Sequence, residues 1–489
     1  MPDISLSFNQ KDFEYDIYSL IRAFYPGQDV KILYSGDSLP EECGISYEVC
    51  YKQDSIGFVW GKGEERREDS VQIAADAPRM ERKNALKHLV YTCLREELGK
   101  DLPWGNLTGI RPTKIAMQLS EKGWKNTEIA RYMRETYLTS PEKTALAIAT
   151  VNREKAILQD IDVENGYSLY VGIPFCPSIC LYCSFGSHPL DRFRKMVEPY
   201  LATLFQELAF IADQMRDRTL HTIYIGGGTP TTLTPDQMGR LLSEICRLFD
   251  LSHLLEFTVE AGRPDTITEE ILSVMKSYPV DRISINPQTM NQQTLDLIGR
   301  AHTVVQTEEA FRLARKLGFE NINMDLIVGL PGEGIREVEQ TLNAVKMLDP
   351  DSLTVHSLAL KRATRLNLFK DSYAQISFHN SAEIMRMCEL AASEMGMGPY
   401  YLYRQKNIAG NFENVGYATE GHYGIYNILI MEEKQTIMAA GSGASTKFVF
   451  EHGERIERAE NVKDLKNYME RIDEMMARKK AGIDRYLRS

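Results

Sequence analysis

The sequence predicts an α/β protein built around a partial, open barrel of six parallel strands. Between about residues 165 and 360, short β-branched apolar runs alternate with longer amphipathic segments, the pattern of parallel strands joined by crossover helices. The patterns before and after this region differ from it. We therefore expect an N-terminal α+β domain (1–150), the barrel (160–365) and a C-terminal region of mixed helices and antiparallel strands that covers the substrate (366–489).

The N-terminal region combines short strands with longer helices. Arg111 and Lys114 flank Pro112 beside a predicted helix start, which suits either anion binding or a solvated turn with proline at the first helical position. A further helix at 140–160 connects this region to the barrel. The strand candidates are 31–35, 45–51, 55–60 and 71–75, and the helix candidates are 79–99 and 113–135.

Six strands are expected in the barrel, and the segments between them carry apolar residues at helical spacing. Functional residues of such barrels lie on loops at the carboxyl ends of the strands. After the barrel, helical sequence continues to about 396, residues 421–461 predict an antiparallel meander, and 464–480 predict a surface helix. The barrel strands are 168–175, 222–228, 256–262, 282–288, 321–331 and 352–360.

Composition restricts the class of protein. The 489 residues are 43% hydrophobic and 26% charged, as in a water-soluble globular fold. No run approaches the roughly 18 apolar residues of a membrane span. A net charge of −11 argues against a nucleic-acid partner. The chain start has no secretory pattern and its eight cysteines are mostly scattered, so we expect a cytoplasmic protein.

Cys176, Cys180 and Cys183 place three thiols within eight residues, directly after the first barrel strand. Three thiolates can hold an iron–sulfur cluster and leave one iron open to a small molecule, whereas four-cysteine clusters are closed electron carriers. Cys246 is the nearest other cysteine. Two alternatives are buried structural cysteines and a zinc site completed by His188.

Polar residues and glycines follow the later strands. Gly226, Gly227 and Gly228 end the second strand in GGGTP, where missing side chains let a ligand approach the backbone. Glu260 and Asp325 end the third and fifth strands, and buried carboxylates there need a partner or a ligand. They could instead accept hydrogen bonds from neighbouring loop amides. Gln288 ends the fourth strand in the same way, and Arg300 adds a guanidinium able to hold a carboxylate.

The CxxxCxxC spacing after an apolar strand, with Tyr182 before the last cysteine, resembles the radical S-adenosylmethionine (SAM) superfamily. The longer stretch YVGIPFCPSICLYC is similar to the oxygen-independent coproporphyrinogen III oxidase family, and most of all to its HemZ-type coproporphyrinogen dehydrogenases. The resemblance runs from about 165 to 450. It implies a 4Fe-4S cluster on the three cysteines, with SAM bound at the open iron.

The resemblance also implies the residues that contact SAM. Gly227, Gly228 and Thr229 would contact its methionine part, and Glu260 its amino acid end. Further contacts follow in the same way: Gln288 and Asp325 to the ribose, Arg300 to the methionine carboxylate, and Tyr170, Tyr182 and Ala359 at other positions of the SAM site.

The implied reaction is radical-based oxidative decarboxylation of coproporphyrinogen III, which converts propionates to vinyl groups and yields protoporphyrinogen IX for haem biosynthesis. A low-potential donor such as flavodoxin or ferredoxin would supply electrons. Basic residues would attract the four propionates of this tetrapyrrole. The candidates are Lys361, Arg362, Arg365, Arg404 and Lys406.

The chain departs from this family in two places. Phe185 stands where the well-studied oxidases have a fourth cysteine, two positions after the third. The His-Asn-x-x-Tyr-Trp element of related haem chaperones is also absent, although His422 could still ligate haem iron or be an ordinary loop histidine. A haem-binding or haem-transfer protein and another tetrapyrrole-directed radical enzyme, such as a methyltransferase, therefore stay as alternatives.

Overall fold

The computed structural model describes residues 4–34, 37, 44–62, 65–184, 186–359, 380–405 and 408–488. The chain divides into two compact units. The first consists of residues 1–151 and 403–413, and the second of 152–402 and 414–489. The sequence did not predict that residues 403–413 belong to the first unit. The division into three parts, with a boundary near residue 365, stays a prediction.

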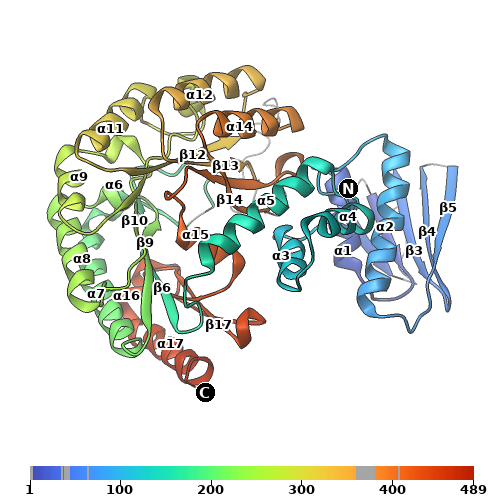
Figure 1. The fold of residues 1–489 in the computed structure, drawn as a ribbon, viewed down its shortest axis with the longest axis horizontal. Coiled ribbons are helices and arrows are strands. Elements are labelled where there is room, and N and C mark those ends of the chain that lie inside the picture. The colour runs from blue at the N-terminus through green and yellow to red at the C-terminus, as the bar shows by residue number, and fades with distance from the viewer. Residues whose placement is uncertain are drawn as a thin grey trace. The chain divides into compact units, whose positions relative to one another are not determined.

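The first unit contains a five-stranded sheet in the order β2-β1-β3-β4-β5, in which β1 runs parallel to β2 and β3 while β3, β4 and β5 are antiparallel. Helices α1 and α2 cover one face of it (Figure 1). The elements are β1 (Ile4–Phe8), α1 (Glu14–Phe24), β2 (Val30–Tyr34), β3 (Ile45–Tyr51), β4 (Ser55–Lys62), β5 (Glu65–Gln72), α2 (Arg79–Leu98), α3 (Thr113–Glu121), α4 (Asn126–Tyr137) and α5 (Pro141–Leu158).

Three features of this unit differ from the sequence-based prediction. Strand β1 and helix α1 were not predicted, because a five-residue strand with two serines has little signal before its neighbours are known. Strand β5 precedes most of the predicted run at 71–75, since backbone pairing with β4 holds its exposed, charged residues in the sheet. The predicted helix at 113–135 is two helices, broken near Gly123, whose φ of 84° lies in the left-handed region.

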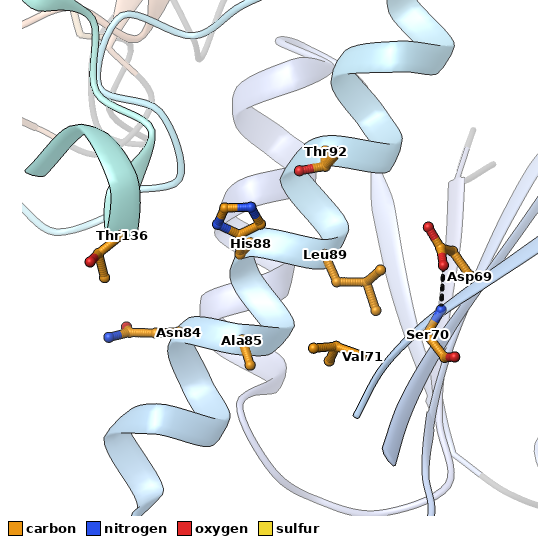
Figure 2. Close-up of a pocket in the computed structure, with 9 residues that line it drawn as sticks. All are labelled: Asp69, Ser70, Val71, Asn84, Ala85, His88, Leu89, Thr92 and Thr136. Carbon is orange, nitrogen blue, oxygen red and sulfur yellow. Dashed lines mark hydrogen bonds between the residues drawn. The ribbon is translucent and has the colours of Figure 1, made fainter. Parts of the chain in front are cut away.

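A pocket of about 420 Å³ lies in the first unit between β5 and α2 (Figure 2). Asp69 and Ser70 form one side of it, and His88 on α2 and Thr136 on α4 line the opposite side. It contains none of the residues that the sequence singles out for chemistry, all of which except Arg111, Lys114, Arg404 and Lys406 fall in the second unit's numbering. The pocket therefore takes no part in the site described below.

The second unit contains one large sheet in the order β14-β15-β13-β12-β11-β10-β9-β6-β16-β17-β18. Its six central strands are parallel, which confirms the α/β class and the six predicted barrel strands. Each ends before its predicted end, because the residues that follow leave the sheet and form loops. The strands are β6 (Gly166–Ile173), β9 (Thr219–Gly227), β10 (Glu256–Glu260), β11 (Arg282–Ser284), β12 (Asn321–Val328) and β13 (Ser352–Ser357).

Helices form an outer layer around these strands (Figure 1). Several begin at a threonine whose hydroxyl accepts the hydrogen bond of a first-turn backbone N–H, as Thr234 does for α8 and Thr303 for α11. These caps place the helix starts where the sequence signals them. The helices are α6 (Leu190–Phe193), α7 (Val197–Gln214), α8 (Pro235–Leu248), α9 (Glu269–Lys276), α10 (Gln292–Leu297), α11 (Val304–Lys316), α12 (Ile335–Leu348) and α14 (Ala382–Glu394).

The C-terminal part extends both edges of the parallel sheet. Strand β15 adds antiparallel to β13, whereas β16 adds parallel to β6 and then continues antiparallel into β17 and β18. The predicted meander over 421–461 is therefore correct only for β16 to β18, since residues 425–432 form a helix instead. The predicted surface helix is two helices, and Lys479 on the second is fully buried against Glu207 (Nζ to Oε1 2.6 Å). The elements are β14 (Gly398–Tyr403), β15 (Asn414–Ala418), α15 (Ile425–Glu432), β16 (Thr436–Ala440), β17 (Ser445–Phe450), β18 (Arg455–Glu460), α16 (Leu465–Glu470) and α17 (Ile472–Tyr486).

Candidate functional site

The three-cysteine loop leaves the sheet directly after β6. Its first cysteine belongs to β7 (Phe175–Cys176), a two-residue strand that pairs with β8 (His188–Pro189) and so closes the loop at its base. The Cys183 N–H donates to the Cys180 carbonyl (3.1 Å). The Leu181 N–H donates to the carbonyl of Ile298, which follows α10 (2.9 Å). Both ends and the middle of the loop are therefore held by backbone contacts.

Hydrogen-bond donors from the segments after β9, β10 and α10 reach two of the cysteine sulfurs. The Thr229 hydroxyl, after β9, lies 3.4 Å from the Cys176 sulfur. The Arg263 and Arg300 guanidinium groups lie 3.8 and 3.9 Å from the Cys180 sulfur. Burial raises the pKa of the Cys176 thiol, and its hydrogen bond from Thr229 opposes that shift. Donors and positive charges of this kind stabilise sulfur in its thiolate form.

The donor set fits an iron–sulfur cluster in its chemistry, because three thiols lie on one short loop and two of them already receive N–H or O–H hydrogen bonds. Among the described residues, no three Cys, His, Asp or Glu side chains lie close enough together to hold a metal ion. This absence includes a zinc site formed by the three cysteines and His188, in the described part of the chain. The three sulfurs would thus have to turn toward one another when a metal centre binds.

The glycine turn after β9 packs tightly against the end of β6. A Cβ atom on Gly228 would lie 2.6 Å from the Phe175 carbonyl oxygen, and one on Gly226 would lie 2.8 Å from the Glu260 carboxyl carbon. Gly227 has a φ of 103°, which side chains rarely allow. The Gly228 N–H donates to the Ile173 carbonyl (2.8 Å). Glycine is needed here both for close approach and for backbone conformation, as the sequence predicts.

Glu260 is the last residue of β10 and lies beside the glycine turn. The Tyr224 hydroxyl donates to its Oε1 at 2.5 Å, and the Tyr224 ring stacks on Tyr426 with ring centres 4.6 Å apart. Tyr170 stacks on the same pair. Burial is the main cause that raises the pKa of Glu260 to about 7, against the hydrogen bond from Tyr224. A carboxyl with this pKa changes charge near neutral pH, which is typical of a binding or catalytic site.

The backbone of Gln288 is strained, and it lies next to β12. Its φ of 69° is in the left-handed region, a conformation that costs about 1–3 kcal/mol in a non-glycine residue. Its N–H donates to the Asp325 carbonyl (3.0 Å), and its carbonyl accepts from the Ile327 N–H (2.9 Å). The side-chain Oε1 is buried and has no hydrogen-bond partner among the described residues. Strain together with an unpaired buried acceptor indicates a residue kept for a ligand.

Asp325 lies inside β12, three residues before its end, so the prediction that it ends the strand was wrong. Because Gln288 bridges to β12 at Leu326, the two candidate ribose ligands nevertheless lie at the same level of the sheet. Burial acts to raise the pKa of Asp325, but hydrogen bonds from His356 and Asn323 hold it below its usual range. Asp325 is therefore ionised at neutral pH.

Arg300 braces the site. It is 4% exposed, and its Nη2 donates to the carbonyl oxygens of Gly262 (2.8 Å) and Asn286 (2.6 Å). Its Nη1 donates to the Tyr182 hydroxyl at 3.0 Å. The Nε is buried without a partner in the described part of the chain. Arg300 thus joins the ends of β10 and β11 to the cysteine loop and keeps one donor for a ligand.

Several residues of this site were not predicted. Arg263 and Tyr224 contact predicted site residues directly, and His302 is fully buried near them. Arg263 could have been suspected from its position in EAGRPD, three residues after Glu260. Tyr224 and His302 carry no such signal, because only the packing of neighbouring strands brings them to the site.

Of the predicted substrate-binding residues, Arg404 lies in the part of the chain that the structure describes. Lys361, Arg362, Arg365 and Lys406 lie outside the described residues, as does Phe185. Arg404 belongs to the first unit and is 5% exposed; its guanidinium donates to the Leu107 carbonyl (2.7 Å) and to Asn411. A substrate contact for Arg404 gains no support from this placement. Ala359 is the last described residue before 360–379 and is partly buried.

The two histidines considered as metal ligands, His188 and His422, make their contacts with residues other than the predicted SAM contacts. The His188 ring packs on Phe193 with ring centres 4.8 Å apart, and burial lowers its pKa. His422 shares a hydrogen bond with the Thr419 hydroxyl (Nδ1 to Oγ1 2.9 Å), and its carbonyl accepts from Arg282. These contacts are typical of ordered loop histidines.

Comparison with known proteins agrees with this geometry. Residues 170–345 match the model of the radical SAM superfamily, the class that the parallel sheet and the cysteine loop indicate. The chain is 43% identical over 395 residues to the oxygen-independent coproporphyrinogen-III oxidase-like protein HemZ of Bacillus subtilis, covering 80% of this chain and 79% of that protein. It is 35% identical over 244 residues to the heme chaperone HemW of the same organism, covering 50% of this chain and 63% of that protein.

The solved structure of the coproporphyrinogen III oxidase HemN from Escherichia coli aligns with a TM-score of 0.52 and 24% identity, over 66% of this chain and 73% of that chain, which supports the fold. The protein belongs to the HemZ-type family of oxygen-independent coproporphyrinogen-III oxidase-like proteins within the radical SAM superfamily. Membership in this superfamily implies a 4Fe-4S cluster and SAM. Of the helices that the structure describes, none combines the length and the apolar character needed to cross a membrane.

Proposed function

We propose that the protein is a radical SAM enzyme that decarboxylates propionate side chains of coproporphyrinogen III to vinyl groups without oxygen. One observation carries the proposal: the cysteine loop, the glycine turn and Glu260 follow three adjacent parallel strands, β6, β9 and β10, and contact one another. The substrate class comes from similarity to HemZ over four-fifths of the chain. The proposed activity is more specific than the family assignment and depends on it.

Cys176, Cys180 and Cys183 would hold the cluster. A cluster bound there would supply the one-electron reduction of SAM on which hydrogen abstraction from carbon depends. SAM would be held by residues that follow the strands: Gly227, Gly228, Thr229, Glu260, Gln288, Arg300 and Asp325, with Tyr170, Tyr182 and Ala359 completing its site.

The chain's own residues would bind SAM through charge and burial. The ionised Glu260 attracts the cationic amino group of SAM, and the pKa near 7 means that ligand binding must hold this carboxylate in its charged form. Gln288 and Asp325 offer a neutral and a charged acceptor to the ribose hydroxyls. Tyr224, whose hydroxyl donates to Glu260, stacks with Tyr170 and Tyr426, which gives this carboxyl a partly apolar surrounding.

Substrate binding is assigned by charge alone. Lys361, Arg362 and Arg365 follow the sixth barrel strand in the sequence and would attract propionates, while a low-potential flavodoxin or ferredoxin would reduce the cluster. The carboxyl group leaves as carbon dioxide after hydrogen abstraction from the propionate. The remaining electron must pass to an acceptor.

The test is an anaerobic reaction of reconstituted protein with dithionite, SAM and coproporphyrinogen III, analysed by mass spectrometry. We expect loss of two carboxyl groups, and we expect Cys180→Ser to abolish both iron binding in stoichiometric amount and SAM cleavage. Cys246→Ser, a partly buried cysteine on α8, is the matched control and should keep both. Intact substrate beside cleaved SAM would contradict decarboxylation.

A haem-binding or haem-transfer role is the second candidate, because a heme chaperone is 35% identical to half of this chain. In that case the protein would bind haem stoichiometrically and would not consume SAM in the reaction above. A methylated tetrapyrrole product would instead indicate a methyltransferase.

A further inference from the structure

Arg263 has an environment that the SAM site does not explain. It lies three residues after Glu260, is 3% exposed, and directs Nη1 to the Cys180 sulfur at 3.8 Å. The same nitrogen donates to the Ser178 hydroxyl at 3.2 Å, inside the cysteine loop. The opposite edge of the guanidinium makes a two-point ion pair with Asp265, from Nε to Oδ1 (2.9 Å) and from Nη2 to Oδ2 (2.8 Å).

Asp265 orients this guanidinium. The two parallel hydrogen bonds fix the plane of Arg263, so only Nη1 can turn toward the cysteine loop. Ser178 in turn donates to the Gly299 carbonyl at 3.2 Å, which links the loop to the segment after α10. The buried guanidinium of Arg263 thus binds a partly exposed carboxylate along one edge and points its remaining nitrogen at a cysteine sulfur.

We propose that Arg263 and Asp265 form a positioning pair that sets the reduction potential of the cluster held by Cys176, Cys180 and Cys183. The inference rests on the proposed cluster site. Each electron that enters the cluster adds one negative charge next to the Cys180 sulfur. A buried positive charge at this distance stabilises the reduced state, and the Asp265 carboxylate behind it offsets part of that effect.

Arg300 also brings a positive charge to within 3.9 Å of the Cys180 sulfur. Its terminal nitrogens otherwise donate to neutral groups, namely the Tyr182 hydroxyl and the carbonyls of Gly262 and Asn286, so these contacts offer no counter-charge to substitute. His302 adds no charge, because burial and the nearby Arg300 and Arg263 lower its pKa to about 3 and it is neutral at working pH. The Arg263–Asp265 pair is thus a charged element beside Cys180 whose positive and negative members can be substituted separately.

The two members of the pair predict shifts of opposite sign. Arg263→Gln removes the positive charge, so at a fixed solution potential the ratio of reduced to oxidised cluster should fall about tenfold, which corresponds to about 59 mV for a one-electron couple. Asp265→Asn leaves Arg263 without its counter-charge, so the ratio should rise. Arg263→Lys keeps the charge and should stay close to the parent protein.

The experiment is an anaerobic redox titration of the reconstituted full-length protein without SAM, followed by electron paramagnetic resonance of the reduced cluster. Arg240→Gln is the matched control, since Arg240 also pairs with carboxylates but lies exposed on α8. Its potential should be unchanged. Opposite shifts for Arg263→Gln and Asp265→Asn support the proposal, and shifts of the same sign, or none, overturn it.

If Arg263→Gln fails to hold a cluster, Asp265→Asn alone decides the question, because disruption of the loop has no reason to raise the potential. Failure of the proposed function has a different signature: the parent protein itself would show no reducible iron–sulfur signal. The two failures are therefore distinguishable in the same titration.

Discussion

The two sheets of this protein use their polar side chains in opposite ways. In the first unit, β3 alternates buried Tyr47 and Val49 with the more exposed Ser46 and Glu48, so the apolar face meets the helices and the polar face meets solvent. In the second unit, strands such as β10 alternate apolar and polar residues that are both buried, as Phe257 at 0% and Thr258 at 1% exposure show.

The buried polar face of the second sheet is joined by hydrogen bonds between strands. Asn323 on β12 donates to Ser284 on β11 (2.9 Å) and accepts from Ser352 and Thr354 on β13 (3.2 Å each). Buried polar groups are expensive unless they are paired or serve a ligand. The second sheet therefore holds a buried, hydrogen-bonded polar face beside the proposed SAM site, whereas the first sheet exposes its polar face to solvent.

The largest expected effect tests whether the buried face serves SAM. Glu260→Gln should lower SAM cleavage by about 10²–10³-fold, because it removes a charged contact made in a dry site. The rate for the parent protein should rise with pH through about 7, where Glu260 ionises, and the variant should lose this dependence. Rate–pH profiles of SAM cleavage check both statements, and an unchanged profile in the variant would count against this role.

The same substitution has an opposite effect on stability. The pKa of Glu260 is raised in the folded state from 4.5 to about 7, so the folded protein binds the proton more tightly than the unfolded chain. The free energy of unfolding thus falls as pH rises from about 4.5 to 7, by about 1–3 kcal/mol. Denaturation at pH 8 should show Glu260→Gln to be more stable than the parent protein, with little difference at pH 4.5.

A buried cation in the first unit should act on stability alone. Arg404→Ala should lower the free energy of unfolding by about 3 kcal/mol, since it leaves the Leu107 carbonyl and Asn411 without their donor. The exposed Arg66 on β5, paired with Glu48 on β3, is the control and should change it by less than about 0.5 kcal/mol. Urea denaturation measures both. Weaker substrate binding by folded Arg404→Ala would restore the predicted substrate contact.

The smallest effect compares equivalent polar positions of the two sheets. Asn323→Ala should destabilise the protein by about 2 kcal/mol, because several buried groups lose a partner at once. Ser7→Ala on β1, whose hydroxyl makes one partly exposed hydrogen bond to the Tyr47 carbonyl, should cost less than about 0.5 kcal/mol. Similar losses for the two would remove the distinction between the sheets.

Much of the second unit could be predicted because its signals are local. The strand runs and the glycine turn at Gly226 to Gly228 depend on residues close in sequence, and each was found at its predicted place, although the strands end earlier than predicted. The first unit was harder. Strand β1 and the exposed edge strand β5 owe their conformation to pairing with neighbours, and such pairing leaves little pattern in the strand itself.

The sequence by itself determined the three-cysteine loop, the alternation of strands and helices, and therefore the class of chemistry. Spacing within a few residues carries each of these features. Tertiary structure decided which charges surround the cysteines: Arg263 and Arg300 come from 83 and 120 residues away and meet at one sulfur. Parallel strands bring their carboxyl ends together whatever the length of chain between them, so side chains far apart in sequence form one site at the edge of the sheet.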